Sequence, residues 1–148
     1  MEGKIIFNFI GLFELQIWKE SLRIKDKKII LYADRLVWEK DLRDLAEAYR
    51  IIISKKEDVV FVLAGDGHVR DKLKSMMSKT LFLGYKSGKE LSTIYNSSDI
   101  FAFPSTIETF GNVTLEAMAT WILNIGFLFL ACGIRISISR ICSLVSIV

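Results

Sequence analysis

The stretch that decides the fold is Val59-Val-Phe-Val-Leu-Ala-Gly-Asp-Gly67, in which an unbroken apolar run ends at two glycines. A short run of this kind, bounded by turn residues, is typical of a strand that is buried on both faces. A second such run, Ile29-Ile-Leu-Tyr-Ala33, precedes it along the chain and follows a turn of charged residues. The sequence therefore predicts two buried strands.

An amphipathic helix separates these two strands. Its apolar residues recur three or four positions apart over residues 41–54, namely Leu42, Leu45, Ala46, Tyr49 and Ile52. The alternation continues downstream, with helices predicted over 69–77, 89–95 and 113–119, and strands over 80–83 and 99–103. Strands that are joined by single helices form parallel sheets with right-handed crossovers, and helices cover both faces. We therefore predict an α/β fold with a Rossmann-like parallel sheet.

Two cations, Arg35 and Lys40, follow the first strand and precede the first predicted helix. In parallel sheets of this kind, ligands bind beyond the carboxyl ends of the strands. A guanidinium can hold phosphate oxygens through two parallel hydrogen bonds, and an ammonium adds a point charge. The pair therefore suits a diphosphate. The alternative is that both are solvated cations paired with Asp34 or Glu39.

Two acids, Glu108 and Glu116, flank the expected start of the last helix. We expect both carboxylates to face one crevice, where they could accept hydrogen bonds from sugar hydroxyls. Free backbone N–H groups at the helix N-terminus suit a phosphate, and they come from Phe110, Gly111 and Asn112. The alternative is that Glu116 is a solvated helix residue and Glu108 is a charged residue on a loop.

The segment Gly65-Asp66-Gly67-His68-Val69-Arg70 has arginine where a dinucleotide-binding fingerprint has its third glycine. We interpret it as a tight turn that leads into a helix. His68 has no acidic or nucleophilic partner in the sequence pattern, and we interpret it as a loop residue.

Composition places the chain among folded globular proteins, with 148 residues, 51% hydrophobic and 25% charged. The net charge of +3 is too small for the basic stripe of a nucleic-acid-binding protein, but it is compatible with an anionic small molecule or membrane surface. Cys132, Cys142 and a single histidine do not form a zinc motif. No signal-peptide cleavage site follows the apolar N-terminal stretch, so we expect reduced thiols in a cytoplasmic protein.

Five motifs, in order along the chain, resemble the C-terminal, donor-binding domain of family 4 (group 1) glycosyltransferases, which are retaining enzymes of the GT-B fold. They are Arg35-Leu-Val-Trp-Glu-Lys40, Leu63-Ala-Gly-Asp-Gly67, Phe82-Leu-Gly84, Asp99-Ile-Phe-Ala-Phe-Pro-Ser105, and the segment from Glu108 to Ala119 that ends in Glu116-Ala-Met-Ala119. The resemblance covers residues 27–119, close to two thirds of the chain.

The resemblance implies transfer of a hexose from a UDP- or GDP-sugar to a glycan or lipid acceptor. It implies that Arg35 and Lys40 bind the diphosphate, that Glu108 is the catalytic carboxylate beside the transferred sugar, and that Glu116 binds the ribose. The other donor-binding residues that it implies are Gly65, Tyr85, Lys86, Thr109, Phe110, Gly111 and Asn112, with the base near Tyr85 and Lys86. No metal or other cofactor is expected, because cations and a helix N-terminus offset the charge of the leaving diphosphate.

The chain departs from the family pattern in two places. Asp34 stands where the family usually has glycine, and we expect its carboxylate to repel the diphosphate or to occupy the guanidinium of Arg35. After Thr120 the family pattern stops, and the following residues, 121–148, are acid-free and rich in isoleucine. A shifted reading frame, a membrane-associated tail and an alternative buried strand remain open as explanations.

We therefore divide the chain into a lead over 1–26 without assigned structure, a donor-binding domain over 27–120 and an apolar tail over 121–148. The resemblance implies that an N-terminal acceptor-binding domain is missing, so we expect this chain alone to bind a nucleotide without completing transfer. We expect it in the cytoplasm, including at the inner face of the membrane. The alternatives are a non-catalytic membrane-associated module and an inactive truncated gene product.

Overall fold

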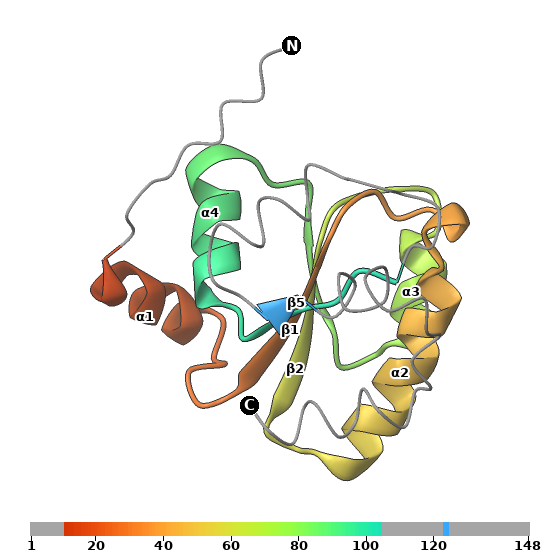
Figure 1. The fold of residues 1–148 in the computed structure, drawn as a ribbon, viewed down its shortest axis with the longest axis horizontal. Coiled ribbons are helices and arrows are strands. Elements are labelled where there is room, and N and C mark those ends of the chain that lie inside the picture. The colour runs from red at the N-terminus through yellow and green to blue at the C-terminus, as the bar shows by residue number, and fades with distance from the viewer. Residues whose placement is uncertain (1–10, 105–122, 125–148) are drawn as a thin grey trace.

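The structure is a computed structural model that describes residues 11–104 and 123–124 (Figure 1). The helices are α1 (Leu12–Ser21), the short 3₁₀ helix η1 (Trp38–Lys40), α2 (Leu42–Lys55), α3 (Arg70–Met76) and α4 (Gly88–Ser97). The strands are β1 (Lys28–Ala33), β2 (Val59–Ala64), β3 (Leu81–Gly84), β4 (Ile100–Phe101) and β5 (Leu123–Asn124).

The strands form one sheet in the order β3-β2-β1-β4-β5, and every neighbouring pair is parallel. β1 lies in the middle, where Ile30 pairs with Phe61 of β2 on one side and with Ile100 of β4 on the other. The predicted parallel α/β sheet is confirmed. The strand order reverses at β1, since the chain leaves β1 for β2 on one side and later returns to its other side at β4.

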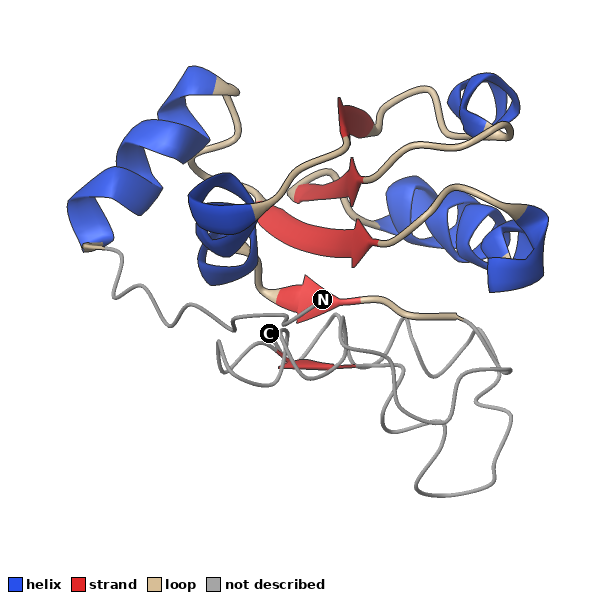
Figure 2. Cartoon of the chain, turned by 90° about the horizontal axis from the view of Figure 1, so that it is seen from above, coloured by secondary structure: helices blue, strands red, loops and turns tan. Residues whose placement is uncertain are grey.

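Apolar side chains fill both faces of the sheet, because alternate residues of a strand point to opposite faces. From β1, Ile30 and Tyr32 pack with α2 and α3, whereas Ile29, Leu31 and Ala33 pack with α4. Figures 1 and 2 show the resulting three layers, with α2 and α3 on one side of the sheet and α1 and α4 on the other. The apolar face predicted for α2 is buried at all five positions, Leu42, Leu45, Ala46, Tyr49 and Ile52.

The helix α1 lies beside α4 on that side of the sheet (Figure 1). Trp18 and Leu22 pack against the core, and Lys89 of α4 forms an ion pair with Glu14 at 3.1 Å. Sequence analysis had assigned no structure to this segment. No helix in the described ranges has both the length and the hydropathy needed to cross a membrane.

The strand predicted over 99–103 is shorter in the structure, where β4 holds two residues. The carboxylate of Asp99 accepts the backbone N–H of Ile29 at 2.8 Å, so a side chain takes the place of a ladder partner just before the strand. Beyond it, the N–H of Ala102 donates to the carbonyl of Leu31 at 2.7 Å. The other predicted strands and helices within residues 27–104 are confirmed with shifts of one or two residues at their ends. The helix predicted over 113–119 lies outside the described residues.

Candidate functional site

The loops that follow β1, β2 and β3 meet at the carboxyl edge of the sheet and are joined by backbone hydrogen bonds. The N–H of Leu36, after β1, donates to the carbonyl of Asp66, after β2, at 2.9 Å. The N–H of Gly65 donates to the carbonyl of Gly84, at the end of β3, at 2.8 Å. The loops that follow β1, β2 and β3 are therefore held together as one unit.

Two glycines make this contact between loops possible. A Cβ atom at Gly65 would lie 2.0 Å from the carbonyl oxygen of Asp34, and one at Gly67 would lie 2.1 Å from that of Leu36. Both distances are far inside van der Waals contact, so any other residue would push the loop after β1 away. The predicted turn before α3 is confirmed. Its glycines have a structural role here, and ligand contact by Gly65 stays a prediction.

Lys40 is a buried cation with a defined counter-ion. Its ammonium lies 2.8 Å from Oδ2 of Asp34, and the side chains of Lys40 and Asp34 are 7% and 13% exposed. The ammonium also lies 5.7 Å from the ring centroid of Phe103, a distance suited to a cation–π contact. The chain turns back after η1 at Asp41, whose φ of 53° is left-handed, and α2 begins at the next residue. Between Asp34 and Lys40 the chain forms η1, in which the N–H of Lys40 donates to the carbonyl of Val37 at 3.2 Å.

The pairing of Asp34 corrects one expectation from the sequence. Asp34 was expected to repel a diphosphate or to occupy the guanidinium of Arg35. Its carboxylate is bound to Lys40 and not to that guanidinium, whereas repulsion of a diphosphate stays a prediction. Its other oxygen, Oδ1, accepts the backbone N–H of Arg35 at 2.7 Å and leaves the guanidinium alone. The alternative of an ion pair with Asp34 therefore holds for Lys40 and not for Arg35.

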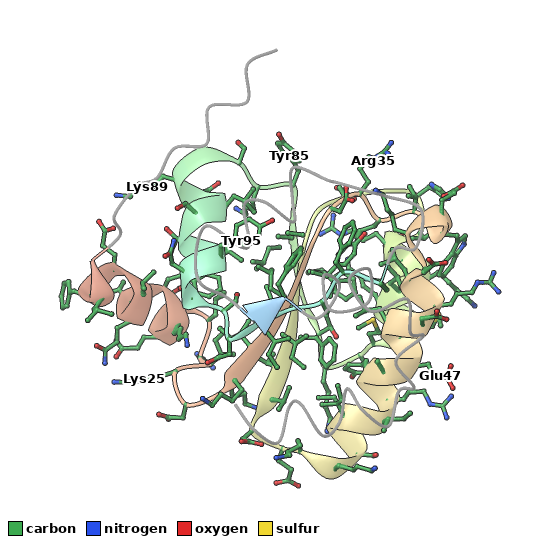
Figure 3. The ribbon with its side chains drawn as sticks, viewed as in Figure 1. Lys25, Arg35, Glu47, Tyr85, Lys89 and Tyr95 are labelled. Carbon is green, nitrogen blue, oxygen red and sulfur yellow. The ribbon has the colours of Figure 1, made fainter. Side chains whose placement is uncertain are left out.

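Arg35 is exposed, and its guanidinium forms no ion pair or hydrogen bond with the described residues. Its backbone is fixed, because the hydroxyl of Tyr32 donates to its carbonyl at 3.0 Å. The side chain points outward at the end of the molecule where the strands finish, and Tyr85 projects from the same end (Figure 3). The backbone of Arg35 is thus held by a hydrogen bond, while its guanidinium is available to an anionic ligand.

Tyr85 and Lys86, which the resemblance places near a nucleobase, directly follow β3. The Tyr85 side chain is 77% exposed, which is unusual for a large aromatic residue. The ammonium of Lys86 lies 3.3 Å from Oε1 of Glu90, a residue four positions further along the chain. An exposed aromatic ring at the same edge as Arg35 provides a surface on which a base could stack.

The remaining predicted site residues lie outside the described part of the chain: Glu108, Thr109, Phe110, Gly111, Asn112 and Glu116. His68 lies within the described residues. It is exposed in the loop before α3, as expected for a loop residue. Within the described ranges, no three metal-ligating side chains are grouped as a metal site would require. Phe103 was not among the site residues predicted from the sequence, although its place after β4 in Phe101-Ala-Phe103 puts it at the same edge of the sheet.

The chain is similar to known proteins of one family. Residues 15–126 match the family described as Glycosyl transferases group 1. The chain is 34% identical over 132 residues to an uncharacterized glycosyltransferase of Methanocaldococcus jannaschii, covering 78% of this chain and 34% of the relative. It is 37% identical over 100 residues to a GDP-mannose-dependent alpha-mannosyltransferase of Corynebacterium glutamicum, covering 68% and 23%.

Among solved structures, the fold is similar to that of HepE from Anabaena in complex with UDP and glucose. The TM-score is 0.68 at 20% sequence identity, and the match covers 78% of this chain and 33% of that one. The chain thus spans about a third or less of the length of these relatives.

Proposed function

The chain belongs to the glycosyl transferases group 1 family, and from this premise we propose that it forms the donor-binding part of a hexosyltransferase that uses a UDP- or GDP-sugar. The proposed reaction moves the hexose to a glycan or lipid acceptor with retention of configuration. Transfer requires that donor and acceptor be held together in a reactive geometry. In this proposal, the groups that the described residues would supply lie on the donor side.

The observation that carries the proposal is the position of Arg35. The residue follows β1, the strand on whose two sides the chain places β2 and β4. In open parallel sheets, the crevice beside such a strand is where ligands bind. An exposed guanidinium at the carboxyl end of that strand, without an ion pair in the described chain and with its backbone carbonyl bound by Tyr32, is suited to a diphosphate.

The names of the relatives indicate which donors to test. The relative from Corynebacterium glutamicum is named for GDP-mannose, and the Anabaena protein was also solved with UDP-glucose. Both donors share a nucleoside diphosphate joined to a hexose. We therefore propose this shared unit as the ligand and leave the base to be decided by measurement.

In this proposal, Arg35 binds the diphosphate, Lys40 is the second cation, and the exposed ring of Tyr85, with Lys86 beside it, meets the base. Gly65, Thr109, Phe110, Gly111 and Asn112 are further donor contacts that the family motif supplies. Glu108 would act at the transferred sugar and Glu116 at the ribose. Positive groups that face the diphosphate would stabilise the charge it gains as it leaves, so the proposal needs no metal.

Calorimetric titration of the chain with UDP and with GDP tests the proposal. We expect saturable binding of at least one of them and a loss of roughly tenfold or more in Arg35→Ala, because a hydrogen bond to a charged group contributes about 1.5–3 kcal/mol. The matched control is Arg50→Ala, which removes the same charge from an exposed position on α2. Circular dichroism confirms that each variant is folded.

Two results would contradict the proposal. Absence of binding of both nucleotides by the folded wild-type chain would refute donor binding. Equal affinities of Arg35→Ala and Arg50→Ala would refute the site, because the loss would then depend on total charge and not on the position of Arg35.

A further inference from the structure

The geometry points to Asp34 as an internal competitor of the donor: its carboxylate occupies the ammonium of Lys40 and thereby weakens the binding of phosphate at this site. The inference rests on the proposed donor-binding function. It concerns a residue for which the family motif has no role, and it predicts that removal of one acidic side chain improves binding.

The carboxylate of Asp34 has the kind of partners that a bound phosphate would have. Oδ2 lies 2.8 Å from the ammonium of Lys40, and Oδ1 accepts the backbone N–H of Arg35 at 2.7 Å. Backbone N–H groups and an ammonium are typical phosphate ligands in proteins. An internal anion thus sits where these two donors converge.

Burial makes this pairing strong. The side chains of Asp34 and Lys40 are almost fully buried, and charges separated by a few ångströms interact more strongly there than at an exposed surface. A phosphate that approaches Lys40 must share the ammonium with this carboxylate and lie close to a like charge. Both effects lower its affinity.

The charge of the cluster leads to the same conclusion. Arg35 and Lys40 carry two positive charges, and Asp34 cancels one of them. A nucleoside diphosphate bears several negative charges, so the cancelled charge matters more for UDP than for UMP and not at all for uridine. The graded response separates an electrostatic competitor from a residue with another role.

The rival interpretation is that Asp34 is a positioning residue. It would hold the ammonium of Lys40 in place over the ring of Phe103, 5.7 Å away, for use by the donor. The two interpretations predict opposite signs. Neutralising Asp34 strengthens UDP binding if the carboxylate competes, and it weakens binding if the carboxylate positions Lys40.

The test is calorimetric titration of UDP into the whole chain carrying Asp34→Asn, which removes the charge and keeps the shape and an oxygen for the N–H of Arg35. We expect UDP to bind roughly tenfold more tightly than to the wild type, equivalent to about 1.4 kcal/mol. The gain should be smaller for UMP and absent for uridine. A gain of the same size for uridine, or an unchanged or weaker affinity for UDP, would overturn the inference.

The chain offers a matched control in the next loop. Asp66 follows β2 as Asp34 follows β1, its Oδ1 accepts the N–H of the next residue at 2.8 Å, and its Oδ2 lies 3.4 Å from Arg70. Its side chain is 55% exposed, however, so its charge is screened by water. Asp66→Asn makes the same change in net charge and should alter UDP affinity by less than about twofold. A gain equal to that of Asp34→Asn would overturn the inference.

A second substitution covers the case in which Asp34→Asn does not fold. Asp34→Gly introduces the residue that the family usually has at this position and removes the same charge. It should also bind UDP roughly tenfold more tightly than the wild type, with a smaller gain for UMP. An unchanged or weaker affinity of the folded variant for UDP would overturn the inference.

The outcomes also separate this inference from the proposed function. Binding by the wild type with no gain in Asp34→Asn overturns the inference alone. Binding by Asp34→Asn without detectable binding by the wild type supports it strongly. If neither protein binds UDP or GDP while both are folded, the inference and the proposed function fail together.

Discussion

The substitution Gly67→Ala tests the contact between the loops after β1 and β2. The added Cβ would lie 2.1 Å from the carbonyl oxygen of Leu36, 2.7 Å from its carbon and 2.9 Å from its nitrogen. Ordinary contact begins at 3.4 Å, so the two loops must separate by up to 3.4 − 2.1 = 1.3 Å. The atoms in the way are backbone atoms, which cannot rotate aside as a side chain can.

The separation carries a definite energetic cost. Leu36 is fully buried, its N–H donates to Asp66 at 2.9 Å, and its carbonyl accepts from Val69 at 3.4 Å. A shift of this size weakens both hydrogen bonds, each with a net value of about 1 kcal/mol. Overpacking of a filled site adds about 1–3 kcal/mol. We therefore expect Gly67→Ala to lower the free energy of unfolding by about 3 kcal/mol, a large share of the 5–15 kcal/mol typical of a domain.

Urea unfolding followed by tryptophan fluorescence measures the effect. Gly84→Ala is the control, because a Cβ there meets no atom within 4 Å but must adopt a φ of +73°. Its cost should be the backbone strain alone, about 1 kcal/mol. If Gly67→Ala proves no more destabilising than Gly84→Ala, the loops are not in the close contact described above.

Two further substitutions test hydrogen bonds that tie elements together. Tyr49→Phe removes the hydroxyl that accepts the N–H of Lys79 at 2.8 Å and keeps the edge-to-face contact with Phe61. Urea unfolding should therefore show that the free energy of unfolding falls by about 1 kcal/mol. An unchanged free energy of unfolding would mean that water replaces the hydrogen bond fully. Asp99→Ala leaves the buried N–H of Ile29 without its partner, so the free energy of unfolding should fall by about 1–3 kcal/mol and hydrogen exchange at that amide should become faster. Asp99→Asn keeps an acceptor and should recover most of this stability. Equal losses of stability in the two variants would contradict this account.

The central strands and the helix α2 could be predicted because their apolar pattern reports burial directly. β2 is buried along its whole length, and α2 buries every third or fourth residue. The helix α1 could not be predicted in this way. Leu12, Phe13 and Ile17 are exposed while Trp18 packs inward, so apolar residues occur around the whole helix and no single face stands out.

The sequence predicted which candidate residues lie at one edge of the sheet, but it did not predict which of their charges pair. The rule that ligands bind at the carboxyl ends of parallel strands brought Arg35, Lys40 and Tyr85 to one edge. The pairing of Asp34 with Lys40 depends on the path of the chain through η1, where the N–H of Lys40 donates to the carbonyl of Val37 at 3.2 Å. The sequence shows both charges but does not reveal the turn between them.

The glycine contact between loops also limits how this protein could change during evolution. A mutation at Gly65 or Gly67 alters the path of the loop after β1 and the stability of the domain at the same time, so natural selection cannot adjust one without the other. Substitution of the outward-facing side chains of Arg35 and Tyr85 does not couple the loop path to stability in this way. Under the proposed function, new ligand preferences should therefore arise by exchange of those exposed side chains, while the two glycines persist for their structural role.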